Sequence, residues 1–372
     1  MDYYFLIITI IDVFVLSIMC ILTKYSEALN KQQRLWFISS FLLIISISIL
    51  EVVTVVVDKR PASFRWVNII ANYLGFGLSP AVPIFLASAL GKSRSTKYAI
   101  TIEVVYLLFL AVTFPLKIVF YVDQNNQYIR ERFFGIYLAA YFSSILYLLV
   151  MTLRFATKYQ NKSKSSIYPI AVFLLAGTMV QVVFSQIHVT WLCVSLLSIL
   201  FFTYCNGMWQ QLDNLTGLLN QKSYLNITAS LSRDGTLVVF DVDDFKAIND
   251  NYGHLMGDQC LEVIASCIKK AYSKDGFCYR IGGDEFCVLL DATADKEVCH
   301  RRLIKELNFR RRTLDVRPYV SVGSASFAAG DNALKVKEAA DRDLYRFKKE
   351  HKKSRQFLLY ADKLYDKSPD LE

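Results

Sequence analysis

This 372-residue sequence has little of what marks a protein held together by metals or disulfides. Its eight cysteines form no Cys-x-x-Cys pair, and its four histidines show no spacing typical of zinc ligands. We therefore expect no zinc site and free thiols that pack as small apolar side chains. Internal repeats, low-complexity tracts and a Gly/Ser-rich tether are also lacking, so we expect neither a repeat array nor a long flexible linker.

A charge excess is missing from the second half of the chain. Residues 210–372 hold 26 Lys and Arg against 25 Asp and Glu, whereas residues 1–209 hold 16 against 8. A near-neutral C-terminal half gives no electrostatic reason to expect a nucleic-acid partner. We interpret the basic run at 310–312 as a solvated surface feature.

Long apolar runs fill the first half instead. Seven such stretches lie at 4–22, 35–57, 66–90, 98–120, 135–156, 167–187 and 191–208. Each reaches or approaches the roughly 20 residues that cross a bilayer as a helix. Most show no polar face at helical spacing, which disfavours buried helices of a soluble core. Residues 1–209 are thus predicted to form a seven-helix, multi-pass membrane domain in contact with the lipid bilayer. The first stretch lacks the features of a cleaved secretory signal, so we expect it to be retained.

Basic residues in the loops predict the orientation of this domain. The loops at 24–34, 91–97 and 154–166 carry ten Lys and Arg, and the alternate loops carry five. The positive-inside rule places the richer loops in the cytoplasm. Seven crossings then put Met1 outside and the C-terminal half in the cytoplasm.

Helical and strand-like patterns alternate through that C-terminal half. Helices are predicted at 220–231, 256–272, 295–308 and 333–351, and strands at 236–240, 277–280, 286–290, 319–325 and 356–359. The strand-helix-strand-strand-helix-strand order is that of palm and ferredoxin-like folds. We predict a cytosolic α/β domain with this βαββαβ core over residues 210–360, followed by a tail at 361–372.

Two acidic clusters in this domain carry a family resemblance. The first reads Phe240-Asp-Val-Asp-Asp-Phe-Lys-Ala-Ile-Asn-Asp250, followed by Gly253-His254 and Gly257-Asp258, and the second reads Arg280-Ile-Gly-Gly-Asp-Glu-Phe286. The runs at 213–220, 320–323 and 340–348 fit the same pattern in the same order. Together they resemble the GGDEF family of diguanylate cyclases, which condense two GTP into cyclic di-GMP. This resemblance covers roughly residues 210–360.

The resemblance implies a metal-dependent phosphoryl-transfer site. When a 3′-hydroxyl attacks an α-phosphorus, negative charge is crowded, and divalent cations held by carboxylates relieve it. By resemblance, Asp241, Asp284 and the carbonyl of Val242 hold Mg²⁺, or Mn²⁺ in its place. Glu285 is expected either to contact a second metal or to accept the 3′-hydroxyl proton, and the sequence leaves both roles open.

Phosphate contacts are implied at two further places. Gly282 and Gly283 would allow positive φ and let the backbone approach a triphosphate, although a Gly-Gly hairpin also occurs without such a role. Asp244, Phe245 and Lys246 follow a strand and open a short helix, whose free N–H groups favour phosphate.

The remaining substrate contacts are implied by single positions. Lys348 and Lys352 stand four apart on a predicted helix and match phosphate-contacting positions, although the family usually has Arg at the second. Asn249 and Asp258 match the pair that reads guanine. Their alternative roles are a helix end for Asn249 and a helix N-cap for Asp258.

One family feature is missing. Many members carry an inhibitory Arg-x-x-Asp site that binds the product, and the corresponding residues here are Ser273-Lys274-Asp275-Gly276. We therefore expect weak or absent product feedback.

The predicted function is that of a homodimeric, membrane-bound diguanylate cyclase in the bacterial plasma membrane, whose membrane domain senses an unknown ligand. The alternative is a catalytically silent, GTP-binding signalling scaffold. A transporter with a regulatory domain is disfavoured by the odd helix count and the lack of inverted repeats. Within the apolar stretches, Asp12 and Glu51 are either functional residues or partners in hydrogen bonds between helices. Glu103 and Lys117 are expected near the ends of their stretch.

Overall fold

The structure is a computed structural model that describes residues 3–91, 93–159, 189–310 and 318–365, with isolated positions at 169, 172, 176, 179 and 316. Its contacts divide the chain into an N-terminal unit, Met1–Gln210, and a C-terminal unit, Gln211–Glu372. Each unit is described by itself below.

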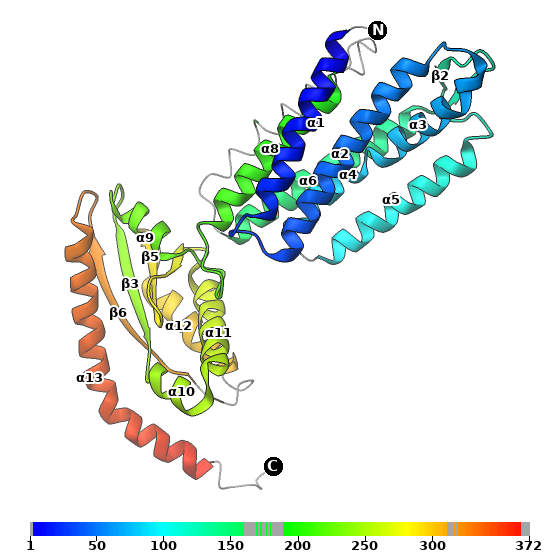
Figure 1. The fold of residues 1–372 in the computed structure, drawn as a ribbon. Coiled ribbons are helices and arrows are strands. Elements are labelled where there is room, and N and C mark those ends of the chain that lie inside the picture. The colour runs from blue at the N-terminus through cyan, green and yellow to red at the C-terminus, as the bar shows by residue number, and fades with distance from the viewer. Residues whose placement is uncertain are drawn as a thin grey trace. The chain divides into compact units, whose positions relative to one another are not determined.

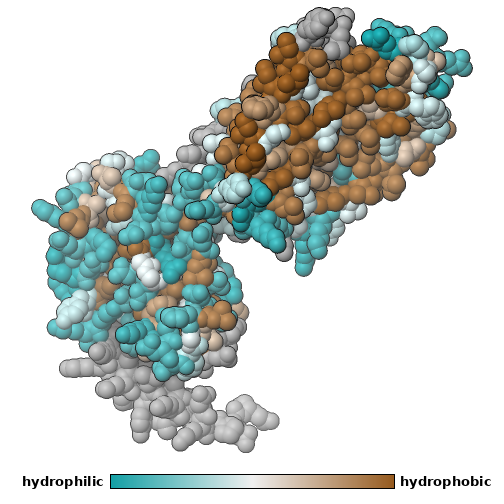
Figure 2. All heavy atoms as spheres, viewed as in Figure 1, coloured by the Kyte–Doolittle hydropathy of each residue, from teal (hydrophilic) through white to brown (hydrophobic). Residues whose placement is uncertain are grey.

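Helices dominate the N-terminal unit (Figure 1). They are α1 (Tyr3–Lys24), α2 (Lys31–Val57), α3 (Arg65–Leu78), α4 (Ala81–Ser88), α5 (Arg94–Thr113), α6 (Gly135–Lys158) and α8 (Thr190–Trp209), with a short 3₁₀ turn at Ala62–Phe64 and a hairpin of β1 (Phe120–Val122) and β2 (Tyr128–Arg130). Apolar side chains cover most of the visible surface of this unit, whereas hydrophilic ones predominate on the C-terminal unit (Figure 2). An apolar outer surface is what helices in contact with lipid require.

Five helices in the described residues are long and apolar enough to cross a membrane, namely α1, α2, α5, α6 and α8. A sixth span is present if the bent pair around α3 and α4 is counted as one. The predicted stretch at 167–187 lies outside the described residues. By length and composition, the described residues therefore contain five or six candidate spans, and the predicted count of seven is not confirmed.

Prolines explain where the predicted apolar stretches depart from the helices. The stretch at 66–90 is interrupted by a bend of 40° between α3 and α4, because Pro80 cannot donate to the carbonyl of Phe76 and its ring displaces that carbonyl. The Tyr106 hydroxyl donates to the carbonyl of Phe76 instead, at 3.3 Å. The stretch at 98–120 was predicted too long, since α5 ends at Thr113, two residues before Pro115.

Two acidic side chains are buried inside this unit. Asp12 on α1 accepts a hydrogen bond of 2.7 Å from the Ser195 hydroxyl on α8. Glu103 was expected near the end of its stretch, and that was wrong: α5 begins at Arg94, so Glu103 lies mid-helix and only 8% exposed. Among the described residues, one carboxylate oxygen of Glu103 has no hydrogen-bond partner.

The C-terminal unit is built on one four-stranded antiparallel sheet (Figure 1). Its strands are β3 (Gly235–Val242), β4 (Gly276–Arg280), β5 (Glu285–Asp291) and β6 (Val320–Phe327), in the spatial order β4-β5-β3-β6. Its helices are α9 (Gln221–Thr228), α10 (Phe245–Tyr252), α11 (His254–Tyr272), α12 (Lys296–Arg310) and α13 (Ala333–Tyr365). The predicted βαββαβ order is confirmed in β3, α11, β4, β5, α12 and β6.

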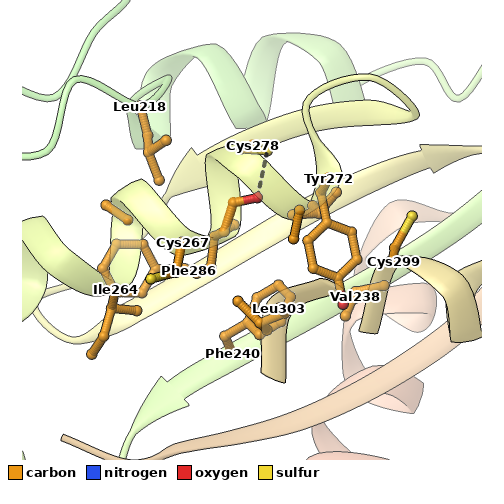
Figure 3. Packing of buried hydrophobic residues seen from close by; sticks show 14 of the residues in the cluster. Leu218, Val238, Phe240, Ile264, Cys267, Tyr272, Cys278, Phe286, Cys299 and Leu303 are labelled. Carbon is orange, nitrogen blue, oxygen red and sulfur yellow. Dashed lines mark hydrogen bonds between the residues drawn. The ribbon is translucent and has the colours of Figure 1, made fainter. Parts of the chain in front are cut away.

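Alternation along β3 decides which helices cover which face of the sheet. Val238 and Phe240 face the core formed with α11 and α12 (Figure 3). Leu237 and Val239 face the core formed with α9 and α13. Because side chains alternate strictly along a strand, Asp241 belongs to the same face as Val239, which is the face that α13 covers.

The predicted strand at 356–359 is wrong. Helix α13 continues from Ala333 to Tyr365 and runs through the predicted domain end at residue 360. No Gly or Pro interrupts this segment, and a short apolar run such as the one at 357–360 fits a helix as well as a strand.

All eight cysteines are free, and six of them are buried.

Candidate functional site

The antiparallel register of β3 and β5 brings the acidic clusters together. Asp241, near the end of β3, is the register partner of Glu285, the first residue of β5. The amide of Val242 donates to the carbonyl of Asp284 at 3.2 Å. Asp241 and Asp284 are half-buried, and Glu285 is exposed. Asp241 therefore meets the neighbouring pair Asp284 and Glu285, which lies more than forty residues later in the sequence, at one end of the sheet.

Helix α13 adds a cation to this group. The Lys348 ammonium lies 2.5 Å from Asp241 Oδ1. The helix packs closely on β6 because Gly323 has no side chain: a Cβ there would lie 2.4 Å from the carbonyl oxygen of Ala340 and 2.3 Å from the amide of Leu344. The structure thus pairs two residues for which the sequence predicted different roles: Asp241 as a metal ligand and Lys348 as a phosphate contact.

The turn between β4 and β5 differs from its prediction in one respect. Neither Gly282 nor Gly283 takes a positive φ, because the turn closes when the amides of Ile281 and Gly282 donate to the carbonyl of Glu285, at 3.0 and 3.3 Å. The turn depends instead on the lack of a side chain at Gly282. A Cβ on Gly282 would lie 3.1 Å from the Cβ of Glu285, while a Cβ on Gly283 would meet nothing within 4 Å.

The side chain of Arg280 holds this turn in place. Its Nε and Nη2 donate to the carbonyl of Gly283, at 3.2 and 2.8 Å, and its Nη1 pairs with Asp213 Oδ1 at 3.0 Å. Asp213 also accepts from the amide and hydroxyl of Thr216, at 2.8 and 2.6 Å. Burial would raise the pKa of Asp213, but the hydrogen bonds from Thr216 and Arg280 outweigh it and lower the pKa below its usual value.

Arg280 and Asp213 both belong to sequence motifs, but the motifs alone predict no role for either residue. The signal was present, since an Arg opens the signature run and an Asp opens the run at 213–220. Their pairing is long-range, however, and two runs in the order of a family do not reveal which side chains touch.

The segment after β3 turns sharply into α10. Asp244 adopts a left-handed conformation with φ 53°, which Asp tolerates better than most residues. Phe245 and Lys246 are the first two residues of α10; Phe245 is half-buried and Lys246 is exposed. This predicted phosphate-contacting group thus begins a helix next to the end of β3.

The predicted guanine-reading pair is also brought together. The Asn249 side chain lies in space left by Gly257, where a Cβ would be 2.0 Å from Asn249 Oδ1. Asp258 follows Gly257 in the first turns of α11 and is exposed. The alternative role of Asp258 as a helix N-cap is wrong, because α11 begins at His254 with Gly253 as its N-cap.

Lys352 lies on α13, four residues after Lys348. Its side chain is outside the part of the chain for which side chains are described, so its predicted phosphate contact stays a prediction.

The oxygen atoms available at this site suit Mg²⁺, which shares its ligands with substrate and water, better than a metal ion that is coordinated by protein side chains alone. Among the described residues, no group of three or more His, Cys, Asp or Glu side chains is arranged to hold a metal ion. Magnesium is usually held by one or two carboxylates together with substrate phosphates and water. The side chains of Asp241 and Asp284 and the carbonyl of Val242 match that pattern.

Comparisons with known proteins cover the same part of the chain. Residues 210–354 match the family described as diguanylate cyclase, GGDEF domain. Diguanylate cyclase DgcP of Pseudomonas aeruginosa is 36% identical over 153 residues, which cover 37% of this chain and 22% of that protein. Probable diguanylate cyclase DgcI of Escherichia coli is 35% identical over 141 residues, covering 37% and 31%. Diguanylate cyclase VdcA of Vibrio cholerae is 34% identical over 151 residues, covering 37% and 43%.

The matched region spans between about a fifth and two fifths of the length of these curated relatives. A solved structure of the GGDEF domain of DgcB from Caulobacter crescentus, in complex with c-di-GMP, is 30% identical and covers 38% of this chain and 91% of that one, with a TM-score of 0.33. Residues 210–354 of this chain are therefore similar to the GGDEF domain of diguanylate cyclases.

Proposed function

We propose that this protein is a membrane-bound diguanylate cyclase that joins two GTP into cyclic di-GMP. Each 3′-oxygen attacks the α-phosphorus of the other GTP, the bond to the β-phosphate oxygen breaks, and two pyrophosphates leave. The observation that carries the proposal is the meeting of Asp241, Asp284, Glu285 and Lys348 at one end of the sheet. Such a group of carboxylates and a cation suits a reaction in which phosphate charge must be neutralised.

Asp241, Asp284 and the Val242 carbonyl would hold Mg²⁺ or Mn²⁺. The metal, when bound, supplies positive charge next to the reacting phosphate. Glu285, exposed beside this group, would accept the proton of the 3′-hydroxyl or contact a second metal. Lys348, Lys352 and the start of α10 would contact phosphate oxygens.

Guanine selection is assigned to Asn249 and Asp258. A carboxylate accepts hydrogen bonds from both N1–H and the exocyclic amine of guanine, and adenine has no equivalent edge. The proximity of Asn249 to Gly257, the neighbour of Asp258, supports a shared role.

The active unit is proposed to be a homodimer. One domain presents one group of acidic side chains and would hold one GTP, while cyclic di-GMP contains two linkages made between two nucleotides. Two-fold symmetry supplies the second half-site. Specific activity that rises with protein concentration supports this assignment, and full activity of a sample shown to be monomeric contradicts it.

The N-terminal unit is proposed to span the bacterial plasma membrane and to sense a ligand. Its five or six apolar spans and apolar surface support membrane insertion, and the basic loops favour Met1 outside with the GGDEF domain in the cytoplasm. The second candidate, a silent GTP-binding scaffold, has the same fold but needs no intact acidic group.

The test is a turnover assay on the full-length chain in detergent. The protein is incubated with GTP and Mg²⁺, and the products are separated and weighed by mass spectrometry. Formation of cyclic di-GMP and pyrophosphate supports the cyclase. GTP binding without any product, in the presence and absence of lipid, supports the scaffold instead.

A further inference from the structure

The carboxylate of Asp241 already has a cationic partner. Lys348 Nζ donates to Asp241 Oδ1 at 2.5 Å, and the two side chains are 38% and 20% exposed. Lys348 therefore lies against the carboxylate to which the proposed function assigns the metal.

The position of Lys348 is set by how α13 is held on the sheet. Gly323 allows the helix backbone to approach β6, and Asp343 of α13 accepts a hydrogen bond of 2.8 Å from the amide of Ser324. Lys348 follows Asp343 by five residues, and α13 covers the face of β3 on which Asp241 stands. The ion pair between Lys348 and Asp241 thus follows from the packing of α13 on the sheet.

One carboxylate cannot bind an ammonium and a divalent cation at the same time with the full affinity that it has for each alone. Magnesium lies about 2 Å from its carboxylate oxygens, so a metal on Asp241 and an ammonium at hydrogen-bond distance would be only a few ångströms apart. Two positive charges at that separation repel each other unless an anion lies between them. The triphosphate of a bound GTP is such an anion.

We propose that Lys348 is a built-in counter-ion that competes with the divalent metal for Asp241 and moves to the nucleotide phosphates when metal and GTP bind together. The inference rests on the proposed function, because it takes Asp241 as a metal ligand. Metal alone then binds weakly, since it must displace the ammonium. Nucleotide strengthens metal binding by engaging the displaced lysine, and metal strengthens nucleotide binding by the same factor.

The test measures metal affinity without turnover. Full-length protein in detergent is titrated with Mn²⁺, and free Mn²⁺ is followed by electron paramagnetic resonance. Four proteins are compared: wild type, Lys348→Met, Lys349→Met and Asp241→Asn. Lys349 is the matched control, because it carries the same charge one residue further along α13 and lies 4.9 Å over the Tyr345 ring.

Without nucleotide, Lys348→Met is expected to bind Mn²⁺ about two- to fivefold more tightly than wild type, as fits removal of a partly exposed ion pair. Lys349→Met should match wild type, and Asp241→Asn should lose this binding. The titration is repeated with the α,β-methylene analogue of GTP, which cannot release pyrophosphate. The gain in Mn²⁺ affinity caused by the analogue should be smaller in Lys348→Met than in wild type.

The outcomes separate this inference from the proposed function. Equal Mn²⁺ affinity in Lys348→Met and Lys349→Met overturns the competition, even where wild type makes cyclic di-GMP. An unchanged effect of the analogue in Lys348→Met overturns the transfer of the lysine to phosphate. Wild-type protein that binds no Mn²⁺ under any condition overturns the metal assignment and the inference with it.

Discussion

The guanidinium of Arg280 ties Asp213 to the signature turn. Its Nη1 lies 3.0 Å from Asp213 Oδ1, while its Nη2 donates to the carbonyl of Gly283, one residue before Asp284, at 2.8 Å. Asp213 follows the last residue of α8 by only four positions in the sequence. The turn that carries Asp284 is therefore held by the first segment of its own domain.

Replacing Arg280 by Met should lower stability and turnover together. Loss of its hydrogen bonds to a carboxylate and a carbonyl should cost about 1–3 kcal/mol, and the freed turn should position Asp284 less well. Thermal unfolding and the rate of cyclic di-GMP formation measure the two effects. Arg302→Met is the control, since it breaks a similar pair with Asp275 at 2.8 Å away from the turn. Equal losses of turnover in both variants would contradict a positioning role for Arg280.

The same pair predicts a dependence of stability on pH. The pKa of Asp213 is lowered in the folded protein, so its contribution to stability is complete above the usual Asp pKa and disappears as the pH falls through the folded pKa. The difference in Tm between wild type and Asp213→Asn should thus be largest near neutral pH and shrink in acid. A difference that stays constant down to the most acidic pH at which the protein folds would rule out this linkage.

Replacing Asp284 by Asn should abolish product formation and leave the fold intact. Metal ligation needs the negative charge, whereas Asp284 is half-buried in an exposed turn whose closure uses backbone groups. We expect a loss of at least about 100-fold in turnover, with an unchanged circular dichroism spectrum and Tm. Turnover near the wild-type rate would refute the assignment of this residue.

Asp258 should control the choice of base. Replacing it by Ala leaves guanine N–H groups without an acceptor, so GTP turnover should fall while ATP stays a poor substrate. Competition assays with both nucleotides, read by mass spectrometry, measure the ratio of products. Asp250→Ala is a control, because Asp250 is another exposed carboxylate of the same region. A wild-type protein that makes mainly mixed dinucleotide would show that the pocket does not select guanine.

Product feedback should be weak. Asp275, the carboxylate nearest to the missing inhibitory motif, is already paired with Arg302 at 2.8 Å and accepts from the Cys299 thiol at 3.4 Å. At Gly276 a Cβ would lie 2.4 Å from the carbonyl of Leu289, so no longer side chain fits there. Cyclic di-GMP added at the concentration of GTP should reduce the rate little. Strong inhibition that is removed by Lys274→Ala or Asp275→Ala would reverse this conclusion.

The sequence by itself determined the acidic motifs, the βαββαβ order and the apolar character of the first 209 residues. These are local properties. Motifs are read directly from neighbouring residues, and a period of two or 3.6 residues reports which face of an element is buried. Asp241, Asp284 and Glu285 could be assigned to one site because the two acidic motifs that contain them resemble the motifs of one family.

Local patterns failed where two alternatives have similar local energies. The run at 357–360 fits a strand or a helix, and the structure continues α13 through it. Glycines in a turn permit positive φ without requiring it, and Gly282 and Gly283 do not use it. Glu103 was misplaced because the start of α5 depends on a cap at Ser93 and not on where the apolar stretch begins.

Only the tertiary structure decided which distant side chains meet. Arg280 and Asp213 are 67 residues apart, and Lys348 and Asp241 are 107 apart. Neither pair has a sequence signature, because each depends on the strand order of the sheet, on the face that α13 covers and on the close approach that Gly323 allows. Long-range pairing of this kind is a property of the packed chain, since its partners are brought together by the burial of other residues.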